Sequence, residues 1–240
     1  TSSRGYRIVK NESMHENANK FYILLSGIFI ASLIASNLIF QKFFTWDVWL
    51  PFVGNYTFEL SVGILPYPIT FLVTDLISEI YGQKKANQVV ISGFVSSIFI
   101  MGVVLIADAV TATAWSPVDD SLFTKVFGLF GPAVFASMTA YLTAQFIDIR
   151  VFHFWKKLTK NKHLWLRNNG STIFSQVVDT SSVLFLLCYF GVIPWEKFSI
   201  LFINGFLFKM LIALIDTPLF YLFSGLLRRK FNLKLGEELV

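Results

Sequence analysis

Residues 171–180 read STIFSQVVDT, and six of these ten side chains can form hydrogen bonds. The stretch opens an apolar run that extends to Phe190, and five other long apolar segments surround it in the sequence. We therefore expect it to enter a lipid bilayer, where an acid costs about 2.5–3.5 kcal/mol, so Asp179 must face protein or water. Gln176 and Asp179 share one helical face. A polar face this dense is typical of a ligand path, although hydrogen bonding between helices would also explain it.

Composition favours the same class of protein. The chain has 240 residues, of which 55% are hydrophobic and only 15% are charged, and its mean hydropathy is +0.62. Soluble domains carry about 25% charged residues, so an all-α membrane protein is indicated. A membrane-spanning helix needs about 20 apolar residues. By that measure we predict six transmembrane helices, at residues 21–41, 62–82, 87–108, 128–149, 170–190 and 198–226.

The basic residues predict how these helices cross the membrane. Sixteen of the 20 Lys and Arg residues fall in segments that this arrangement places on one side, and three fall on the other. Cytoplasmic segments carry the excess of basic residues, so both termini are expected in the cytoplasm. The predicted organisation is a disordered cytoplasmic tail at 1–20, a six-helix transmembrane domain at 21–226 and a basic cytoplasmic tail at 227–240. Topology thus explains the net charge of +5 without a nucleic-acid partner.

The segment between the first two helices is expected to form a short outer hairpin. Thr45–Leu60 interleaves aromatic and polar residues around Gly54 and Asn55, a pattern typical of two strands joined by a turn. The hairpin can lie at the outer membrane interface as an aromatic belt, or it can cover a site as a lid.

Small residues and prolines suggest local features of the first two helices. Gly27, Ala31 and Ala35 form a stripe that favours close packing between helices, and that could also dock a partner protein. Pro66 and Pro68 interrupt the start of the second helix, so backbone carbonyl groups beside them are expected to be free for binding.

Ionisable residues within the predicted helices mark candidate site positions. Asp75 and Glu79 are four apart on one helical face, where two like charges favour protonation of one acid, as proton coupling requires. Glu79 could instead reach the cytoplasmic interface. A lysine inside a membrane needs an acidic partner. We expect Lys209 to pair with Asp75 or Asp179 rather than with Asp216, which lies two turns away on the same helix.

The fourth and fifth helices share a polar pattern. The sequence reads AQFID at residues 144–148 and SQVVD at residues 175–179. Because the two helices are antiparallel neighbours, their glutamines and aspartates are expected to converge, with Gln145 among the candidate ligand contacts. Asp148 lies at the end of its helix and could instead simply pair with Arg150 or Lys156.

Motifs for other kinds of chemistry are missing from the sequence. There is no Gly-rich Lys-Ser/Thr phosphate loop, so the chain is not expected to hydrolyse ATP. No His-Glu-x-x-His metal motif and no nucleophile-turn motif occurs, so we assign no metal, cofactor or catalytic residue. A membrane-embedded enzyme would have only Asp75 and Glu79 as acid and base.

Several short motifs together carry a family resemblance over residues 21–226. They are Ala35-Ser36-Asn37-Leu38, then Pro68-Ile69-Thr70-Phe71 with Asp75, Glu79, Tyr81 and Gly82, then Ser171-Thr172, Ser175-Gln176 and Asp179-Thr180, and finally Thr217-Pro218 with Tyr221. In these motifs the chain resembles the queuosine precursor transporters, also described as vitamin uptake transporters. Tyr67 departs from the phenylalanine expected at its position, which alters one wall of the site.

The resemblance implies a function as well as a fold. It implies a six-helix carrier in the bacterial inner membrane that imports 7-cyano-7-deazaguanine, 7-aminomethyl-7-deazaguanine or queuine, with proton coupling as one option, for the salvage of a tRNA modification. A likeness to the substrate-binding subunits of energy-coupling-factor importers makes a subunit of an ATP-driven vitamin importer the alternative. The partners implied are a purine-like small molecule and membrane lipid, and a small carrier of this kind can form a homodimer.

The chemistry of a guanine-like substrate fits the polar residues in the helices. Its edge presents two adjacent N–H donors, which one carboxylate can accept side by side. A buried amide can read the neighbouring carbonyl, although Asn37 could equally bond another helix. The candidate substrate-binding residues are Asn37, Phe71, Asp75, Glu79, Gln145, Gln176, Asp179, Lys209 and Asp216.

Overall fold

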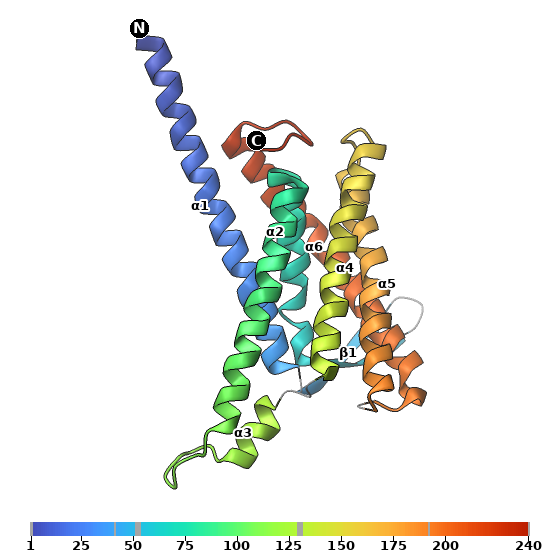
Figure 1. Cartoon of the computed structure of the whole chain (residues 1–240). Coiled ribbons are helices and arrows are strands. Elements are labelled where there is room, and N and C mark those ends of the chain that lie inside the picture. The colour runs from blue at the N-terminus through green and yellow to red at the C-terminus, as the bar shows by residue number, and fades with distance from the viewer. Residues whose placement is uncertain (1, 41, 51–53, 129–131, 192, 240) are drawn as a thin grey trace.

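The structure is a computed structural model that describes residues 2–40, 42–50, 54–128, 132–191 and 193–239. Helices dominate it, and one antiparallel β-hairpin follows the first helix (Figure 1). The helices are α1 Ser2–Ile39, α2 Tyr67–Ala109, α3 Asp120–Phe127, α4 Pro132–Leu158, α5 Leu164–Tyr189 and α6 Phe198–Phe231. The strands are β1 Phe43–Leu50 and β2 Gly54–Ser61, and two short 3₁₀ turns are η1 Val62–Ile64 and η2 Trp195–Lys197.

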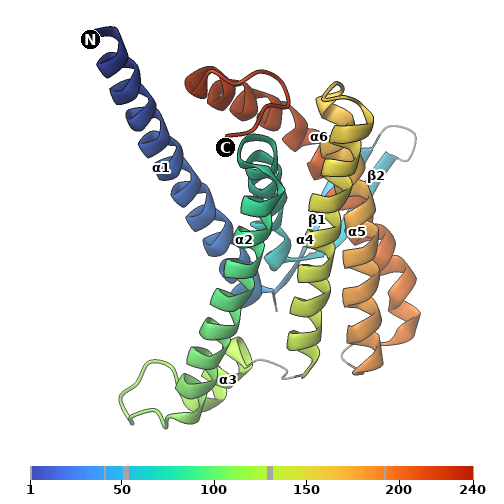
Figure 2. The same cartoon turned by 45° about the horizontal axis from the view of Figure 1, so that its top comes forward.

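The chain passes repeatedly between two ends of the molecule (Figures 1 and 2). We call one the hairpin end, because β1, β2 and α3 lie toward it. We call the other the terminal end, because both ends of the described chain lie there, together with the α4–α5 connection at 159–163. Gly82 lies at the same end, since a Cβ built on it would be 2.3 Å from Glu238 Oε2 near the C-terminus. In sequence order, α1 packs against α2, α2 against α4, α4 against α5, and α5 against α6.

Gly82 divides α2 into two antiparallel arms. Its backbone has φ 80° and ψ 173°, a conformation that glycine adopts without strain and other residues avoid. The chain reverses there at the terminal end, so Tyr67–Tyr81 runs toward that end and residues 83–109 run back (Figure 1). The two arms correspond to the separate helices predicted at 62–82 and 87–108.

Four described stretches are long and apolar enough to cross a membrane: His15–Ile39, Val62–Ala109, Leu164–Tyr189 and Trp195–Phe231. The prediction of an all-α membrane protein is therefore confirmed. α1 begins at Ser2 rather than at residue 21, so the helix includes the segment for which the sequence predicts a tail.

A core of apolar side chains joins α1 to both arms of α2 and to α4. Phe29 and Leu33 of α1 pack with buried residues that include Ile77 and Ile149. A Cβ at Gly93, on the second arm, would lie 2.5 Å from the Phe29 ring. Glycine therefore lets α1 approach the second arm closely.

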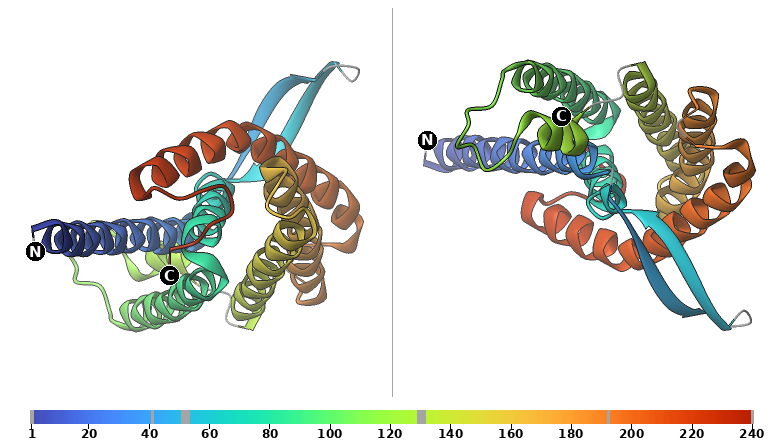
Figure 3. Two further views of the ribbon diagram at one scale, coloured as in Figure 1. Left: turned by 90° about the horizontal axis from the view of Figure 1, so that it is seen from above. Right: turned by 90° about the horizontal axis from the view of Figure 1, so that it is seen from below.

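The hairpin is anchored to α6. Phe58 and Leu60 are buried, and Phe58 lies edge-on to Phe208 with ring centroids 6.2 Å apart. The strands extend away from the helices beyond this contact (Figure 3). Gly54 and Asn55, predicted at the turn, instead belong to β2, where they pair with Leu50 and Trp49.

Two local predictions for the first helices are wrong. Gly27 and Ala31 are exposed, and no atom lies within 4 Å of a Cβ built at Gly27, so these positions do not pack against another helix of this chain. The alternative, that the stripe docks a partner protein, stays a prediction. The backbone carbonyls of Pro66 and Tyr67 accept hydrogen bonds from the Ile69 N–H and the Thr70 hydroxyl. These two carbonyls are used by the helix start and are not free.

Candidate functional site

A cavity of about 310 Å³ opens inside the helices at the hairpin end. Its walls come from α1, both arms of α2, α4, α5 and α6, and residues 59–64 close one side of it. Glu59, Leu60 and Ser61 of β2 line the cavity directly. The hairpin thus covers part of the cavity, as the lid interpretation of this segment requires.

Asp179 and Lys209 form an ion pair in the cavity wall. The Lys209 Nζ lies 2.7 Å from Asp179 Oδ2 and 3.1 Å from the Thr180 hydroxyl. The pair is largely withdrawn from solvent, since the side chains of Lys209 and Asp179 are only 13% and 4% exposed. The prediction that Lys209 pairs with an acid on another helix rather than with Asp216 is confirmed. Asp179 Oδ1 has no hydrogen-bond partner among the described residues.

Aromatic rings line the cavity beside this ion pair. The Tyr67 hydroxyl donates to Asp179 Oδ2, and the Lys209 ammonium lies 4.4 Å from the centroid of the Tyr67 ring. Tyr141 lies edge-on to Tyr67 at 5.5 Å between centroids. Rings in this arrangement offer both apolar surface and polar tips to a flat ligand.

Three predicted site residues contact these aromatic residues but do not line the cavity themselves. Phe71 packs against Tyr67 at 5.2 Å between centroids. The Gln145 amide donates to the Tyr141 hydroxyl at 2.6 Å, and the Gln176 side chain lies beside the Tyr67 hydroxyl. These residues therefore orient the tyrosines and do not line the cavity.

A second group of polar side chains lines the cavity on α1 and the second arm of α2. Ser36, Asn37 and Ser97 belong to the cavity wall. Buried polar atoms are nearly always hydrogen-bonded in folded proteins. Ser36 Oγ, Asn37 Nδ2 and Ser97 Oγ are exceptions, because they are buried and find no hydrogen-bond partner within the described chain.

Two carboxyl groups lie together beyond the cavity, toward the terminal end. Asp75 lies about 12 Å along α2 from Tyr67. Asp75 and Asp148 are both buried, and their carboxyl groups lie close enough to interact electrostatically. The Ser175 hydroxyl donates to Asp148 Oδ1 at 3.0 Å. Asp148 thus contacts Asp75 and Ser175, and the alternative pairing with Arg150 or Lys156 is wrong.

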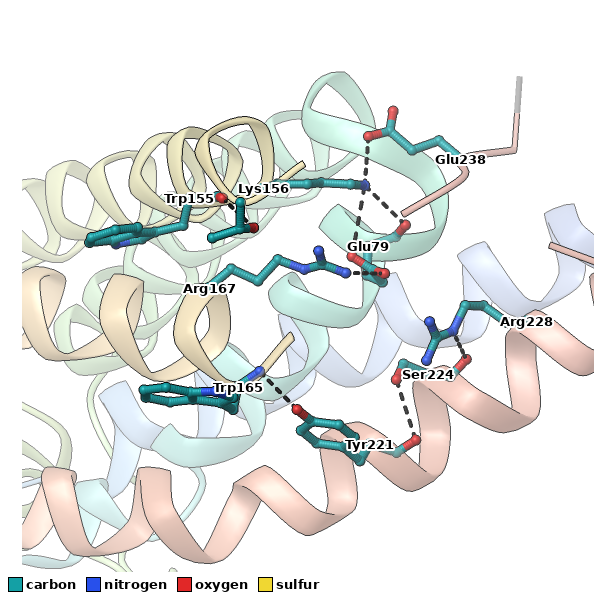
Figure 4. A network of polar contacts seen from close by, with 10 residues as sticks. Glu79, Trp155, Lys156, Trp165, Arg167, Tyr221, Ser224, Arg228 and Glu238 are labelled. Carbon is teal, nitrogen blue, oxygen red and sulfur yellow. Dashed lines mark hydrogen bonds and ion pairs between the residues drawn. The ribbon is translucent and has the colours of Figure 1, made fainter. Parts of the chain in front are cut away.

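Charged residues form a network at the terminal end (Figure 4). The Arg167 Nη2 lies 2.6 Å from Glu79 Oε1, and both side chains are fully buried. The Lys156 ammonium lies 3.7 Å from Glu79 and 2.9 Å from Glu238 in the chain's last described residues. We call Glu79, Lys156, Arg167 and Glu238 the ion network; it joins α2, α4, α5 and the segment after α6.

The ion network corrects two sequence interpretations. Arg167 precedes the predicted span 170–190, but it lies on α5, which begins at Leu164, and its side chain is buried. Glu79 does not reach the interface, because Arg167 holds it inside the protein.

The predicted site residue Asp216 is only half-buried and does not line the cavity.

Sequence reasoning also missed some residues of the cavity. Tyr141 lies four residues before Gln145, so helical spacing from that glutamine would have found it. Ser97 is a single serine in an apolar segment, and no pattern in the sequence distinguishes it from a residue that packs against lipid or core. Glu59 belongs to the hairpin, whose position over the cavity depends on the tertiary fold.

Comparisons with known proteins agree on one family. Residues 61–223 match the family model described as "Putative vitamin uptake transporter". A "Probable queuosine precursor transporter" of Bacillus subtilis (strain 168) is 28% identical over 162 residues, which cover 67% of this chain and 70% of that protein. A protein of the same name from Haemophilus influenzae (strain ATCC 51907 / DSM 11121 / KW20 / Rd) is 28% identical over 225 residues, covering 90% of this chain and 92% of the relative.

No solved structure matches the chain. The family match spans more than half of the 240 residues, from the end of β2 through most of α6. It includes Asp179 and Lys209 as well as the carboxyl groups toward the terminal end. Together with the membrane-length apolar helices, this match shows that the chain belongs to the vitamin uptake transporter family and is a multi-pass protein of the bacterial inner membrane.

Proposed function

We propose that this protein imports a queuosine precursor, a flat base of the 7-deazaguanine class, and that the cavity at the hairpin end is its binding site. The observation that carries the proposal is the ion pair of Asp179 and Lys209, which lines a cavity of about 310 Å³ together with the rings of Tyr67 and Tyr141. The names of the two bacterial relatives support the same substrate class. A cavity with aromatic walls and a few convergent polar groups is the usual form of a small-molecule site.

Asp179 is the group that binds the edge of the base. Its Oδ1 lacks a partner in the described structure, and its Oδ2 already accepts from Tyr67 and Lys209. Two adjacent N–H donors of a guanine-like edge can bind the two oxygens of one carboxylate. Lys209 keeps the carboxylate charged and paired before the base arrives, since an unpaired buried charge is costly.

The proposed topology has six membrane spans with both termini in the cytoplasm. The reversal at Gly82 divides Val62–Ala109 into two spans, and α4, with 27 residues, is long enough to be another. The excess of basic residues then lies on the side of the terminal end. In this orientation the cavity faces the outside, and the ion network closes the path to the cytoplasm.

Asp75 and Asp148 are the proposed groups for coupling to protons. Two neighbouring buried carboxyl groups cannot both be ionised without strong repulsion, so such a pair can hold one proton between them. Collapsing the proton gradient is expected to lower accumulation of the substrate in cells. Unchanged uptake would point to facilitated diffusion instead.

The proposed function is tested by binding and by uptake. Purified protein in detergent is screened by thermal shift against guanine, 7-deazaguanine, its 7-cyano and 7-aminomethyl derivatives, and queuine, because a bound ligand stabilises by mass action. Asp179→Asn is expected to lower affinity and uptake about 10- to 100-fold, the effect of losing hydrogen bonds to a charged group.

The matched control is Asp216→Asn, which changes an acid on α6 that does not line the cavity. It is expected to retain binding and uptake. Failure of every ligand to stabilise the native protein, or normal uptake by Asp179→Asn, would remove the proposed function.

A further inference from the structure

The segment that follows α6 crosses the terminal end of the molecule. The helix ends where Asn232 adopts a left-handed backbone with φ 54° and ψ 39°, a conformation in which asparagine commonly ends a helix. Residues 232–239 then turn back over the end of α2 (Figure 3). None of these residues is fully buried. We call residues 232–239 the strap.

The strap completes the interrupted end of the first arm of α2, Tyr67–Tyr81. Because the chain reverses at Gly82, backbone carbonyl groups in the last turn of this arm lack the donors that a continued helix would supply. The Leu239 N–H donates to the Ile80 carbonyl at 2.8 Å. A Cβ at Gly82 would overlap the Glu238 carboxylate, so the strap also packs directly on the reversal.

The same strap contacts α4 and the α4–α5 connection. Glu238 Oε1 lies 2.9 Å from the Lys156 ammonium (Figure 4). A Cβ at Gly236 would overlap the Asn161 side chain, so the strap lies against the connection as well. The strap therefore bridges the reversal of α2 and the α4–α5 pair at the terminal end.

The contacts of the strap are weaker than those of the ion pair beneath it. Leu233 and Leu239 are only partly buried where they pack against the helices. The Glu238 side chain is 39% exposed, whereas the side chains of Glu79 and Arg167 are fully buried. Exposed ion pairs contribute little to stability, and segments with few buried contacts open most easily. The strap can therefore detach while the helices stay folded.

We propose that the strap gates the cytoplasmic side of the carrier: it holds the α4–α5 connection against the reversal of α2, and it must detach before a bound molecule can leave on that side. The inference rests on the proposed function, in which the cavity faces the outside. A carrier exposes its site to each side of the membrane in turn. Contacts that join the helices at the terminal end must therefore separate during each cycle, and the strap spans that junction.

A reversible covalent link tests the inference. In a Cys188→Ser background, which removes the single native thiol, Lys162→Cys and Leu235→Cys place one thiol on the α4–α5 connection and one on the strap. Both native side chains are exposed, and their neighbours Asn161 and Gly236 lie against each other. A bifunctional thiosulfonate reagent joins the two thiols through disulfides that a reducing agent removes.

Binding and transport are measured separately on the linked protein. Binding of 7-cyano-7-deazaguanine is followed by thermal shift, and transport is followed as exchange of the labelled base into proteoliposomes loaded with unlabelled base. The linked protein is expected to bind the base as the unlinked protein does and to lose exchange, because its site can no longer open to the cytoplasmic side. Reduction of the link is expected to restore exchange.

The matched control links the strap to itself. In the same background, Lys234→Cys and Glu237→Cys replace two neighbours within the strap, since the Lys234 N–H donates to Glu237 Oε2 at 2.9 Å. The linked control is expected to keep both binding and exchange, because the strap stays free to detach.

Two results would overturn the inference. Normal exchange by the protein linked between Lys162→Cys and Leu235→Cys would show that the strap stays in place during transport. Loss of binding in that protein would show that the strap shapes the cavity instead of closing the cytoplasmic side. If the native protein neither binds nor exchanges the base, the proposed function itself fails.

Discussion

The cavity and the ion network both contain a buried ion pair, but only one of the two pairs lies beside open space. Asp179 and Lys209 are paired at 2.7 Å and line the cavity of about 310 Å³. In the ion network, Glu79 and Arg167 are buried against each other at 2.6 Å, and none of the four network residues lines the described cavity. The difference indicates that the first region is built to bind and the second to hold the helices together.

The largest expected effect comes from breaking the buried ion pair. Arg167→Met leaves the buried Glu79 with only the more distant Lys156 ammonium, 3.7 Å away, and is expected to lower the free energy of unfolding by about 3–5 kcal/mol. Thermal unfolding in detergent measures the loss. The double variant Glu79→Gln/Arg167→Met, which removes both charges, is expected to regain most of it. A small loss in the single variant would show that the network does not hold the helices together.

A smaller effect is expected at the ion pair of the cavity. Lys209→Met leaves Asp179 without its cation and is expected to lower the free energy of unfolding by about 1.5–3 kcal/mol. A bound base supplies new donors to Asp179. Adding ligand should therefore raise the Tm of Lys209→Met by more than it raises the Tm of the native protein. The same ligand should leave the deficit of Arg167→Met unchanged. Equal ligand-induced shifts in all three proteins would erase the contrast between the two regions.

A pH-dependent effect is expected beside the ion network. Burial, followed by the nearby charge of Lys156, lowers the pKa of His153 to about 4 from its ordinary value of 6.5. His153 lies beyond the predicted span 128–149. Since the unfolded chain binds the proton more readily, stability is full above pH 6.5 and is lost as pH falls toward 4.

The variant His153→Gln separates this loss from the titration of other groups. Between neutral pH and pH about 4.5, the Tm of the native protein is expected to fall more than the Tm of the variant. Parallel falls in the two proteins would show that His153 is not responsible.

The smallest effect is expected at the exposed edge of the ion network. Glu238 is 39% exposed and contacts Lys156 at 2.9 Å. Pairs that reach solvent contribute about 0–1 kcal/mol, so Glu238→Gln should change Tm by only a degree or two, the scale expected for a chain of this length. A loss as large as that of Arg167→Met would mean that the last residues of the chain carry the stability of the network.

The sequence identified some of these residues for clear physical reasons. A lysine in an apolar helix must pair with an acid. This requirement alone predicted that Lys209 pairs with an acidic residue of another helix. The same reasoning failed for Arg167, because it precedes the apolar part of α5 and a hydropathy window assigns it to a loop. Its burial depends on Glu79, which lies on another helix. Nor could the sequence distinguish Ser36 and Ser97, which line the cavity, from a serine such as Ser26 that bonds its own helix.

The pairing of Asp179 with Lys209 has an electrical consequence. The two buried charges of the cavity cancel, so an uncharged base that enters it adds no net charge to the buried site. A membrane potential does work only on net charge that moves across the bilayer, about 2.3 kcal/mol per elementary charge for each 100 mV. The voltage across the membrane would therefore neither drive nor oppose the movement of the base itself, and any electrical signal during uptake would report ions that travel with it.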